Sequence, residues 1–168
     1  MLRIAITGPE SSGKTTLCRL LSDYFKVPFI SEYARTYLEK TSGAYQQSDL
    51  DFIAKEHLKN ILSSTHFVSI SDTDFSVLEI WSEYKFKKSS RLIKELAGKD
   101  LFGLHILCRP DIPWEADDLR ENEHSRLYLF ELYKASLIMH RKNFIVVEGP
   151  VENRIKKSIE YIEQIINL

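Results

Sequence analysis

An α/β fold with a parallel sheet is predicted by two features of this chain of 168 residues. First, short apolar runs with strand character alternate with longer segments whose apolar residues have helical spacing. Second, a glycine-rich loop stands between the first apolar run and the first helical segment. Strands that alternate with helices form a parallel sheet with helices on both faces. We therefore expect a single domain over residues 1–168 with five parallel strands.

The expected strands are short and apolar, and they lie at residues 2–7, 28–31, 66–71, 104–108 and 144–147. Helices are expected directly after the glycine-rich loop, over 50–62, in two pieces over 75–97, over 121–142, and around 155–166 at the end. Their apolar faces are predicted to include Leu17, Leu20, Leu21 and Tyr24; Leu50, Ile53, Ala54, Ile61 and Leu62; Val77, Leu78, Trp81 and Tyr84; and Leu127, Phe130, Leu137 and Ile138.

The glycine-rich loop, residues 8–15, matches the phosphate-loop pattern G-x-x-x-x-G-K-[ST], and a strand before it and a helix after it are the context that the pattern requires. Such a loop binds a β-phosphate through backbone N–H groups and the positive end of the helix. We expect Lys14 to neutralise phosphate oxygens and the Thr15 hydroxyl to coordinate Mg²⁺. The residues expected to hold ATP here are Gly8, Glu10, Ser11, Ser12, Gly13, Lys14, Thr15 and Thr16.

Glu32 and Arg35 follow the expected second strand. Phosphorylation of a hydroxyl group needs a carboxylate that orients the hydroxyl or accepts its proton, which makes Glu32 a candidate catalytic residue. Arg35 is a candidate for holding a phosphate or steering the acceptor. The alternative is that Ser31 and Glu32 only cap the helix that follows.

Asp72 and Asp74 follow the expected third strand, with Thr73 between them. An acid at the end of an apolar strand is a common second contact of the Mg²⁺ shell in phosphoryl-transfer enzymes. We expect Asp72 to serve the metal and Asp74 to contact the acceptor or cap the next helix. The alternative for Asp72 is also a helix cap.

The longest irregular stretch, residues 109–120, is expected to be a lid that extends to about residue 126. Arg120 and Arg126 are candidates for stabilising the charge on a transferred phosphoryl group when the lid closes, with Arg109 as a third. An exposed ion pair with Glu123 is the alternative role of Arg126. Trp114 either stacks on a planar ring or anchors the lid.

Gly149 and Arg154 follow the expected fifth strand. In phosphate-loop kinases this turn often passes the adenine ring, so Gly149 is expected to allow a close approach and Arg154 to lie along the ring. The alternative is an ordinary turn with Pro150 at the start of a helix.

Composition narrows the classes of partner. The formal net charge is -1 and 28% of the residues are charged, so no strong basic surface indicates nucleic acid. No apolar run is long enough to span a bilayer, and no signal-peptide pattern is seen before the first strand, so a cytoplasmic protein is expected. Cys18 and Cys108 lack metal-ligand spacing and are expected to be reduced. His57 and His105 are expected to be structural.

The motifs together carry a resemblance to one family. Residues 8–16, the Glu-Tyr-Ala-Arg run at 32–35, Asp72-Thr73-Asp74, the Trp-Ser-Glu run at 81–83, and Pro-Asp-Ile-Pro-Trp at 110–114 through Asp-Asp-Leu-Arg at 117–120 resemble the ribosylnicotinamide kinase domain of the NadR family in order and spacing. The resemblance covers nearly the whole chain. Full-length members of that family join this domain to an adenylyltransferase domain, which is not seen here, so a stand-alone kinase domain is expected.

The resemblance implies a nucleoside/nucleotide kinase-like fold that transfers the γ-phosphate of ATP, with Mg²⁺, to the 5′-hydroxyl of nicotinamide riboside. It implies that Glu32, Asp72 or Asp74 engages the ribose and that Tyr33 or Trp114 stacks on the nicotinamide ring. Arg120 would then close the lid. The residues expected at the acceptor are Glu32, Tyr33, Arg35, Asp74, Trp114, Asp117 and Arg126.

Two alternative functions remain at this stage. One is a kinase for another nucleoside or nucleotide. The other is a nucleotide-dependent switch or regulatory ATPase, for which a GTPase pattern is the obvious marker. Asp100 and Gly103 match D-x-x-G by letters, but they precede the fourth strand, and N-K-x-D is absent from the sequence. The oligomeric state is not indicated by any pattern.

Overall fold

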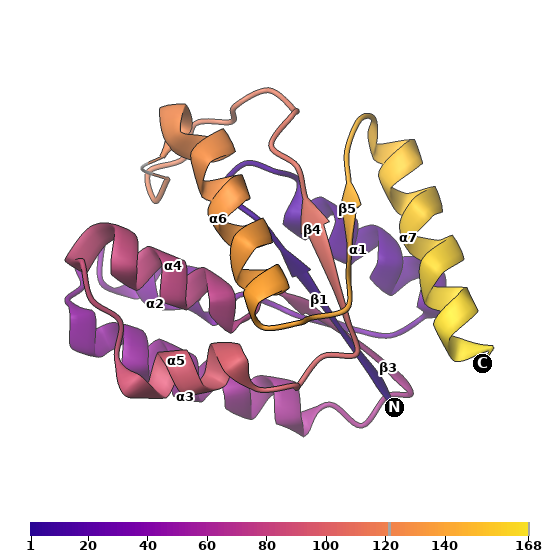
Figure 1. The fold of residues 1–168 in the computed structure, drawn as a ribbon, viewed down its shortest axis with the longest axis horizontal. Helices are drawn as coiled ribbons and strands as arrows, with labels where there is room; N and C mark the ends of the chain where they lie inside the picture. The colour runs from indigo at the N-terminus through magenta and orange to yellow at the C-terminus, as the bar shows by residue number, and fades with distance from the viewer. Residues whose placement is uncertain (121, 168) are drawn as a thin grey trace.

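A five-stranded parallel sheet forms the centre of the protein (Figure 1). The computed structural model describes residues 1–120 and 122–167. The strand order is β2-β3-β1-β4-β5, and every neighbouring pair is parallel, so the expected fold class is confirmed. The strands are β1 (Leu2–Thr7), β2 (Phe29–Ile30), β3 (Val68–Asp72), β4 (Leu104–Cys108) and β5 (Phe144–Val147).

Seven α-helices connect and cover the strands within the described ranges. They are α1 (Lys14–Phe25), α2 (Tyr33–Lys40), α3 (Gln47–Ser63), α4 (Phe75–Phe86), α5 (Arg91–Gly98), α6 (Arg126–Met139) and α7 (Val151–Ile166). α6 is preceded by a short 3₁₀ helix, Glu123–Ser125, and so begins later than the expected residue 121, which lies outside the described residues. None of the described helices is long and apolar enough to cross a membrane.

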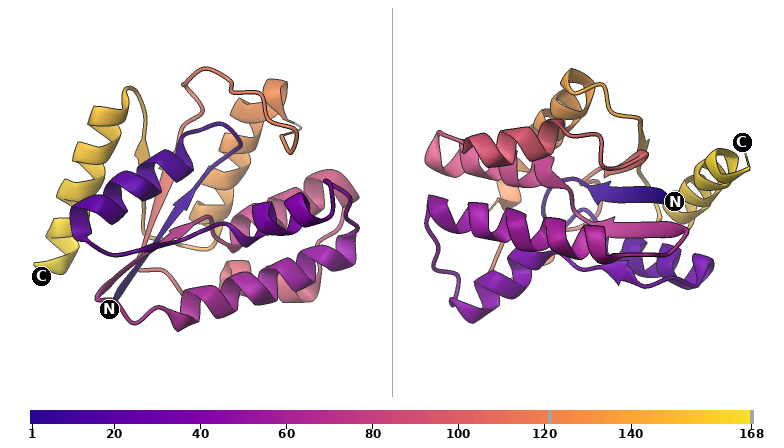
Figure 2. Two further views of the ribbon diagram at one scale, coloured as in Figure 1. Left: turned by 180° about the vertical axis from the view of Figure 1, so that it is seen from behind. Right: turned by 90° about the horizontal axis from the view of Figure 1, so that it is seen from below.

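The helices form a layer on each face of the sheet (Figure 2). Ile4 and Ile6 of β1 pack with apolar residues of α1 and α7 on one face. Ala5, which points the other way because side chains alternate along a strand, packs with α3, α4 and α5. α6 covers Leu107 of β4 beside α4. Both cysteines, Cys18 and Cys108, are free thiols buried in the first of these clusters.

Several residues expected on apolar helix faces are exposed instead. In α6 the buried stripe is Leu129, Phe130, Tyr133 and Leu137, which leaves Leu127 and Ile138 on the solvent side. The physical reason is that a helix of this length has apolar residues on more than one face, and packing against α4 and the sheet selects the stripe. The expectation is likewise wrong for Leu20, Tyr24, Leu62 and Tyr84, all of which are exposed.

The carboxyl ends of the five strands point to the same edge of the sheet, where the connecting loops meet (Figure 1). The register pairs Ile6 of β1 with Asp72 of β3, so Asp72 lies beside the end of β1. Gly8 follows β1 with φ 134°, and a Cβ atom there would lie 2.7 Å from the carbonyl oxygen of Cys108. The phosphate loop therefore crosses the end of β4 at a distance that only glycine allows.

Gly8→Ala is expected to destabilise the protein by about 1–3 kcal/mol, because the new methyl group overlaps backbone that cannot move away and the φ angle is unfavourable for alanine. The measurement is the free energy of unfolding by urea. Gly98→Ala is the matched control, because a Cβ atom at Gly98 would lie 3.8 Å from the His140 side chain, an ordinary contact distance. Equal stability of the two variants would contradict the tight crossing.

Candidate active site

The phosphate loop forms one end of a cavity of about 440 Å³. Gly8 and residues 10–16 line this end. Within the loop, the Ser12 hydroxyl and the Lys14 ammonium both donate to the carbonyl oxygen of Pro9, each at 2.8 Å. These bonds hold the loop in a closed turn whose backbone faces the cavity, as a phosphate-binding loop requires.

Asp72 and Thr15 are the pair that could hold a metal ion. The Thr15 hydroxyl donates to Asp72 Oδ2 at 2.6 Å, and Asp72 is only 3% exposed. The other carboxylate oxygen, Oδ1, is buried and has no hydrogen-bond partner among the described residues. A buried carboxylate oxygen without a partner is costly, and a cation would satisfy it. The pair suits Mg²⁺, which is commonly bound by one or two protein groups together with water and substrate phosphates.

Glu32 lies in the same cavity, where it is half-buried. Burial raises the pKa of its carboxyl group to about 7, and the negative charge of Asp72 acts in the same direction, while Lys14 and Arg35 oppose it. A carboxyl group with this pKa is near the protonation balance that a general base needs at neutral pH.

Asp74 lies beneath the cavity and does not line it. It is buried, and Oδ1 accepts hydrogen bonds from Thr7 at 2.9 Å and Ser76 at 2.6 Å. His105 Nε2 lies 3.4 Å from Oδ2. Thr73, between the two acids, has a φ of 87°. Asp72 accepts a hydrogen bond from Thr15, whereas Asp74 accepts its hydrogen bonds from buried Thr7 and Ser76. Of the two roles considered for Asp74, its position corresponds to the helix cap, because Asp74 is the N-cap residue of α4, although its side chain makes no cap hydrogen bond.

His57 supports the same turn from α3. Its Nε2 lies 3.2 Å from the Ser71 hydroxyl and 3.5 Å from the carbonyl oxygen of Thr73. Burial lowers the pKa of both His57 and His105, while the nearby carboxylates oppose this shift. Their buried positions agree with structural roles.

The loop after β4 is fastened to the phosphate loop. Ser11 Oγ accepts a hydrogen bond from the Glu115 N–H at 3.0 Å, and the Glu10 carboxylate accepts from the Asn122 N–H at 2.9 Å. Arg126 donates to the carbonyl oxygens of Ser11 and Ile112 at 3.1 and 3.0 Å. The side chains of Glu10, Ser11 and Arg126 therefore hold the lid against the loop.

Arg120 and Trp114 occupy different places in the lid. Arg120 lines the cavity and donates to the Glu115 carbonyl oxygen. Trp114 is outside the lining, and its ring faces the guanidinium groups of Arg120 and Arg126, whose central carbons lie 5.9 and 5.5 Å from the ring centroid. Of the two roles considered for Trp114, this position corresponds to the lid anchor.

Arg35 joins the lid to α2. Its Nη2 donates to Asp117 Oδ2 at 2.6 Å, and its Nε donates to Glu39 at 3.2 Å. The pair with Arg35 lowers the pKa of Asp117, and Leu119 N–H adds a further hydrogen bond to this carboxylate. Arg35 lines the cavity, whereas Asp117 does not.

Four aromatic residues also line the cavity: Tyr45, Trp81, Tyr84 and Tyr133. The Trp81 indole N–H donates to the Tyr45 hydroxyl at 2.7 Å. The two rings lie 4.8 Å apart in an edge-to-face arrangement. Tyr33, which was expected to stack on the acceptor, instead packs edge to face on Phe52 away from the cavity.

None of these four aromatic residues was predicted as a site residue from the sequence, and the reason differs between them. Tyr45 precedes α3 in a loop without a recognisable pattern, and Tyr84 and Tyr133 have the spacing of ordinary core positions. Trp81 carried a signal only through the family resemblance. Gly149 and Arg154, expected at the adenine ring, do not line the cavity, and Arg154 is buried behind the phosphate loop.

Curated relatives confirm the resemblance to NadR. The trifunctional NAD biosynthesis/regulator protein NadR of Salmonella typhimurium is 29% identical over 177 aligned residues, which cover 97% of this chain and 42% of the relative. NadR of Escherichia coli is 34% identical over 124 residues, covering 70% of this chain and 30% of the relative. The chain therefore spans less than half the length of these relatives.

Solved structures share the fold. A NadR protein in complex with NAD and AMP-PNP has a TM-score of 0.80 at 18% identity, with 99% of this chain and 50% of that chain covered. A NadR protein in complex with NR has a TM-score of 0.77 at 19% identity, with coverages of 97% and 51%. Deoxyadenosine kinase from M. mycoides has a TM-score of 0.64 at 14% identity, with coverages of 97% and 100%.

The phosphate loop, the sheet order and the lid thus make a phosphate-loop domain of the kinase-like type. Residues 3–154 match the family model AAA_28, described as an AAA domain. Because this match takes in most of the chain, the protein belongs to the AAA_28 family of AAA domains.

Proposed function

We propose that the protein is an ATP-dependent kinase that transfers the γ-phosphate of ATP to the 5′-hydroxyl of nicotinamide riboside, giving nicotinamide mononucleotide. The observation that carries the proposal is one cavity lined by the phosphate loop, by Glu32 and by the contacting aromatic pair Tyr45 and Trp81. The identity to NadR over most of the chain supports the choice of acceptor.

The nucleotide occupies the loop end in this proposal. Backbone N–H groups of residues 10–15 bind the β-phosphate, and Lys14 exchanges its bond to Pro9 for phosphate oxygens. Thr15 and Asp72 would hold Mg²⁺, which when bound neutralises and orients phosphate oxygens. Arg120 lies on the lid side of the cavity, where a positive charge stabilises the negative charge of the transferred group.

The acceptor lies beside aromatic residues of the cavity in this proposal. A flat nicotinamide ring suits the contacting pair Tyr45 and Trp81, because aromatic faces bind planar rings by stacking or edge contacts. Glu32 lines the same cavity and is close enough to Lys14 and Asp72 for their charges to act on its pKa. Glu32 therefore accepts the proton of the 5′-hydroxyl as that oxygen attacks the γ-phosphorus, and ADP leaves.

The acceptor is tested by a screen in which ADP release is followed with MgATP and a panel of nucleosides and nucleotides. Nicotinamide riboside is expected to give the highest kcat/KM. ADP release above the buffer control with deoxyadenosine or another nucleoside, and none with nicotinamide riboside, would replace the named acceptor but keep the kinase. Nucleotide binding without turnover on any acceptor would favour the switch and contradict the proposal.

The role of Glu32 predicts a pH dependence. A base must be ionised to accept a proton, so kcat/KM should rise through pH 7 in the wild type, and Glu32→Gln should lose this rise together with most of the activity, about 100-fold or more. Glu39→Gln is the matched control, because Glu39 also lines the cavity on α2 but is exposed and paired with Arg35. A rise through pH 7 that persists in Glu32→Gln would exclude Glu32 as the base.

The same raised pKa of Glu32 predicts that stability falls with rising pH, whereas activity rises. The folded protein resists ionisation of Glu32 between its ordinary pKa of 4.5 and about 7, so this carboxyl group costs stability as the pH rises through that range. The free energy of unfolding by urea should be measured for Glu32→Gln and the wild type at pH 5 and at pH 8. The difference between variant and wild type should shift in favour of the variant at pH 8.

Arg120→Ala is expected to lower kcat by about 100-fold or more while changing the Kd of ATP little, because its charge acts mainly on the transition state. Steady-state kinetics and calorimetry supply the two values. Arg91→Ala is the control, since Arg91 lies on the exposed start of α5 and pairs only with Glu95 among the ion pairs of the described residues. A normal kcat in Arg120→Ala would remove Arg120 from the catalytic group.

A further inference from the structure

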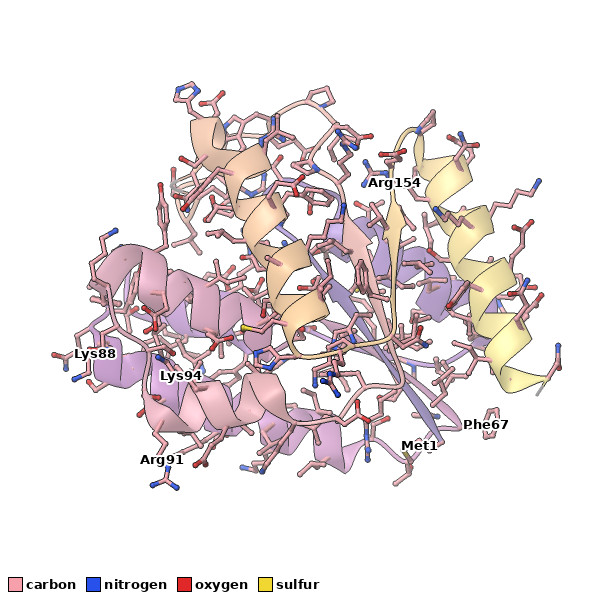
Figure 3. All side chains as sticks on the ribbon, in the orientation of Figure 1. Met1, Phe67, Lys88, Arg91, Lys94 and Arg154 are labelled. Carbon is pink, nitrogen blue, oxygen red and sulfur yellow. The ribbon has the colours of Figure 1, made fainter. Side chains whose placement is uncertain are left out.

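Arg154 joins three loops at the carboxyl edge of the sheet although it lies in α7. Its side chain leaves the first turn of α7 beside the loops after β4 and β5 (Figure 3). Nε donates to the Gly149 carbonyl oxygen at 2.8 Å, Nη1 donates to that of Ser12 at 2.7 Å, and Nη2 donates to that of Arg109 at 3.1 Å. These carbonyl groups belong to the loops after β5, β1 and β4, in that order.

Burial makes these contacts strong. Arg154 is 3% exposed, and Nη2 also donates to the carboxylate of Asp111, which offsets the cost of removing the positive charge from water. Asp111 in turn accepts a hydrogen bond from the Gly149 N–H at 2.7 Å. All three nitrogen atoms of the guanidinium group therefore donate to oxygen atoms of the protein.

The contact with Ser12 has a direct effect on the phosphate loop. In a trans peptide the C=O and the N–H point in opposite directions, so a carbonyl group of Ser12 held toward Arg154 turns the N–H of Gly13 away from Arg154. Ser12 and Gly13 line the cavity, whereas Arg154 does not. The N–H of Gly13 therefore points to the cavity side, where a phosphate group would accept its hydrogen bond.

We propose that Arg154 is a positioning residue that sets the orientation of the Ser12–Gly13 peptide for phosphate binding and ties that peptide to the base of the lid at Arg109 and Asp111. This assigns Arg154 a role behind the loop instead of the contact with the adenine ring expected from its sequence position. Lysine does not replace it, because an ammonium group cannot span three carbonyl groups in a planar fork. The inference rests on one part of the proposed function, the binding of ATP phosphates by the phosphate loop, and it is independent of the acceptor.

The test compares two ligands that share phosphates but differ in the base: MgATP and magnesium tripolyphosphate, each measured by calorimetry with the whole chain. Arg154→Met should weaken both by the same factor, about tenfold or more, because a charged hydrogen bond to the loop is lost. Arg154→Lys should lose less, since one carbonyl contact can be kept. Lys157→Met is the control: Lys157 also lies in α7 and donates to a carbonyl oxygen, that of Val146, which is outside the phosphate loop.

The outcomes separate the possibilities. If Arg154→Met lost affinity for ATP but kept its affinity for tripolyphosphate, Arg154 would contact the adenine ring, and the proposal would be overturned. Affinities of both ligands equal to those of the wild type in Arg154→Lys and Arg154→Met would also overturn it. If Arg154→Met does not fold by circular dichroism, the Arg154→Lys result decides. Failure of the wild type to bind either ligand would instead refute that part of the proposed function itself, the binding of ATP phosphates.

Discussion

The parallel pairing of β1 with β3 is the constraint on which the site depends. Its register sets Ile6 opposite Asp72, so the end of β3 arrives beside the start of the phosphate loop. Without that register, the Thr15 hydroxyl could not reach Asp72 Oδ2 at 2.6 Å. The core on both faces of β1 enforces it, because a slip by one residue would move Ile4 and Ile6 to the face that Ala5 now occupies.

Buried charged groups concentrate at this edge of the sheet, and they differ in how far neighbouring groups compensate their charge. Arg154 is neutralised by Asp111 and by three carbonyl groups, which makes it a structural charge. Asp74 is surrounded by two hydroxyl groups and a histidine. Asp72 has one oxygen without a partner among the described residues, and Glu32 carries a raised pKa. The charges that lack full compensation are the two that line the cavity, as expected where chemistry rather than stability sets the residue.

Local patterns in the sequence were sufficient for the fold, because each strand and most helices carry their own apolar period. They were also sufficient to gather the phosphate loop, Asp72 and Glu32 at one edge, since strand ends in a parallel sheet meet there. They failed where a side chain's direction depends on tertiary packing. Asp74 accepts its hydrogen bonds from buried residues and does not line the cavity, and Arg154 reaches back across two loops instead of forward to a ligand. Neither direction is encoded by spacing along the chain.

The proposed nucleotide site and the proposed acceptor site differ in how the chain supplies their residues. This difference bears on how an acceptor would be selected. The proposed nucleotide site comes from consecutive residues 8–16, held from behind by Arg154 and from above by the lid. The proposed acceptor site comes from single side chains on separate elements, Tyr45 before α3 and Trp81 on α4. A substitution in the loop disturbs every contact that depends on its backbone. A substitution of one of these aromatic residues changes one surface and leaves the loop intact. Such a division lets one phosphate-binding frame serve enzymes with different acceptors, and under the proposed function the choice of acceptor would depend on the aromatic residues.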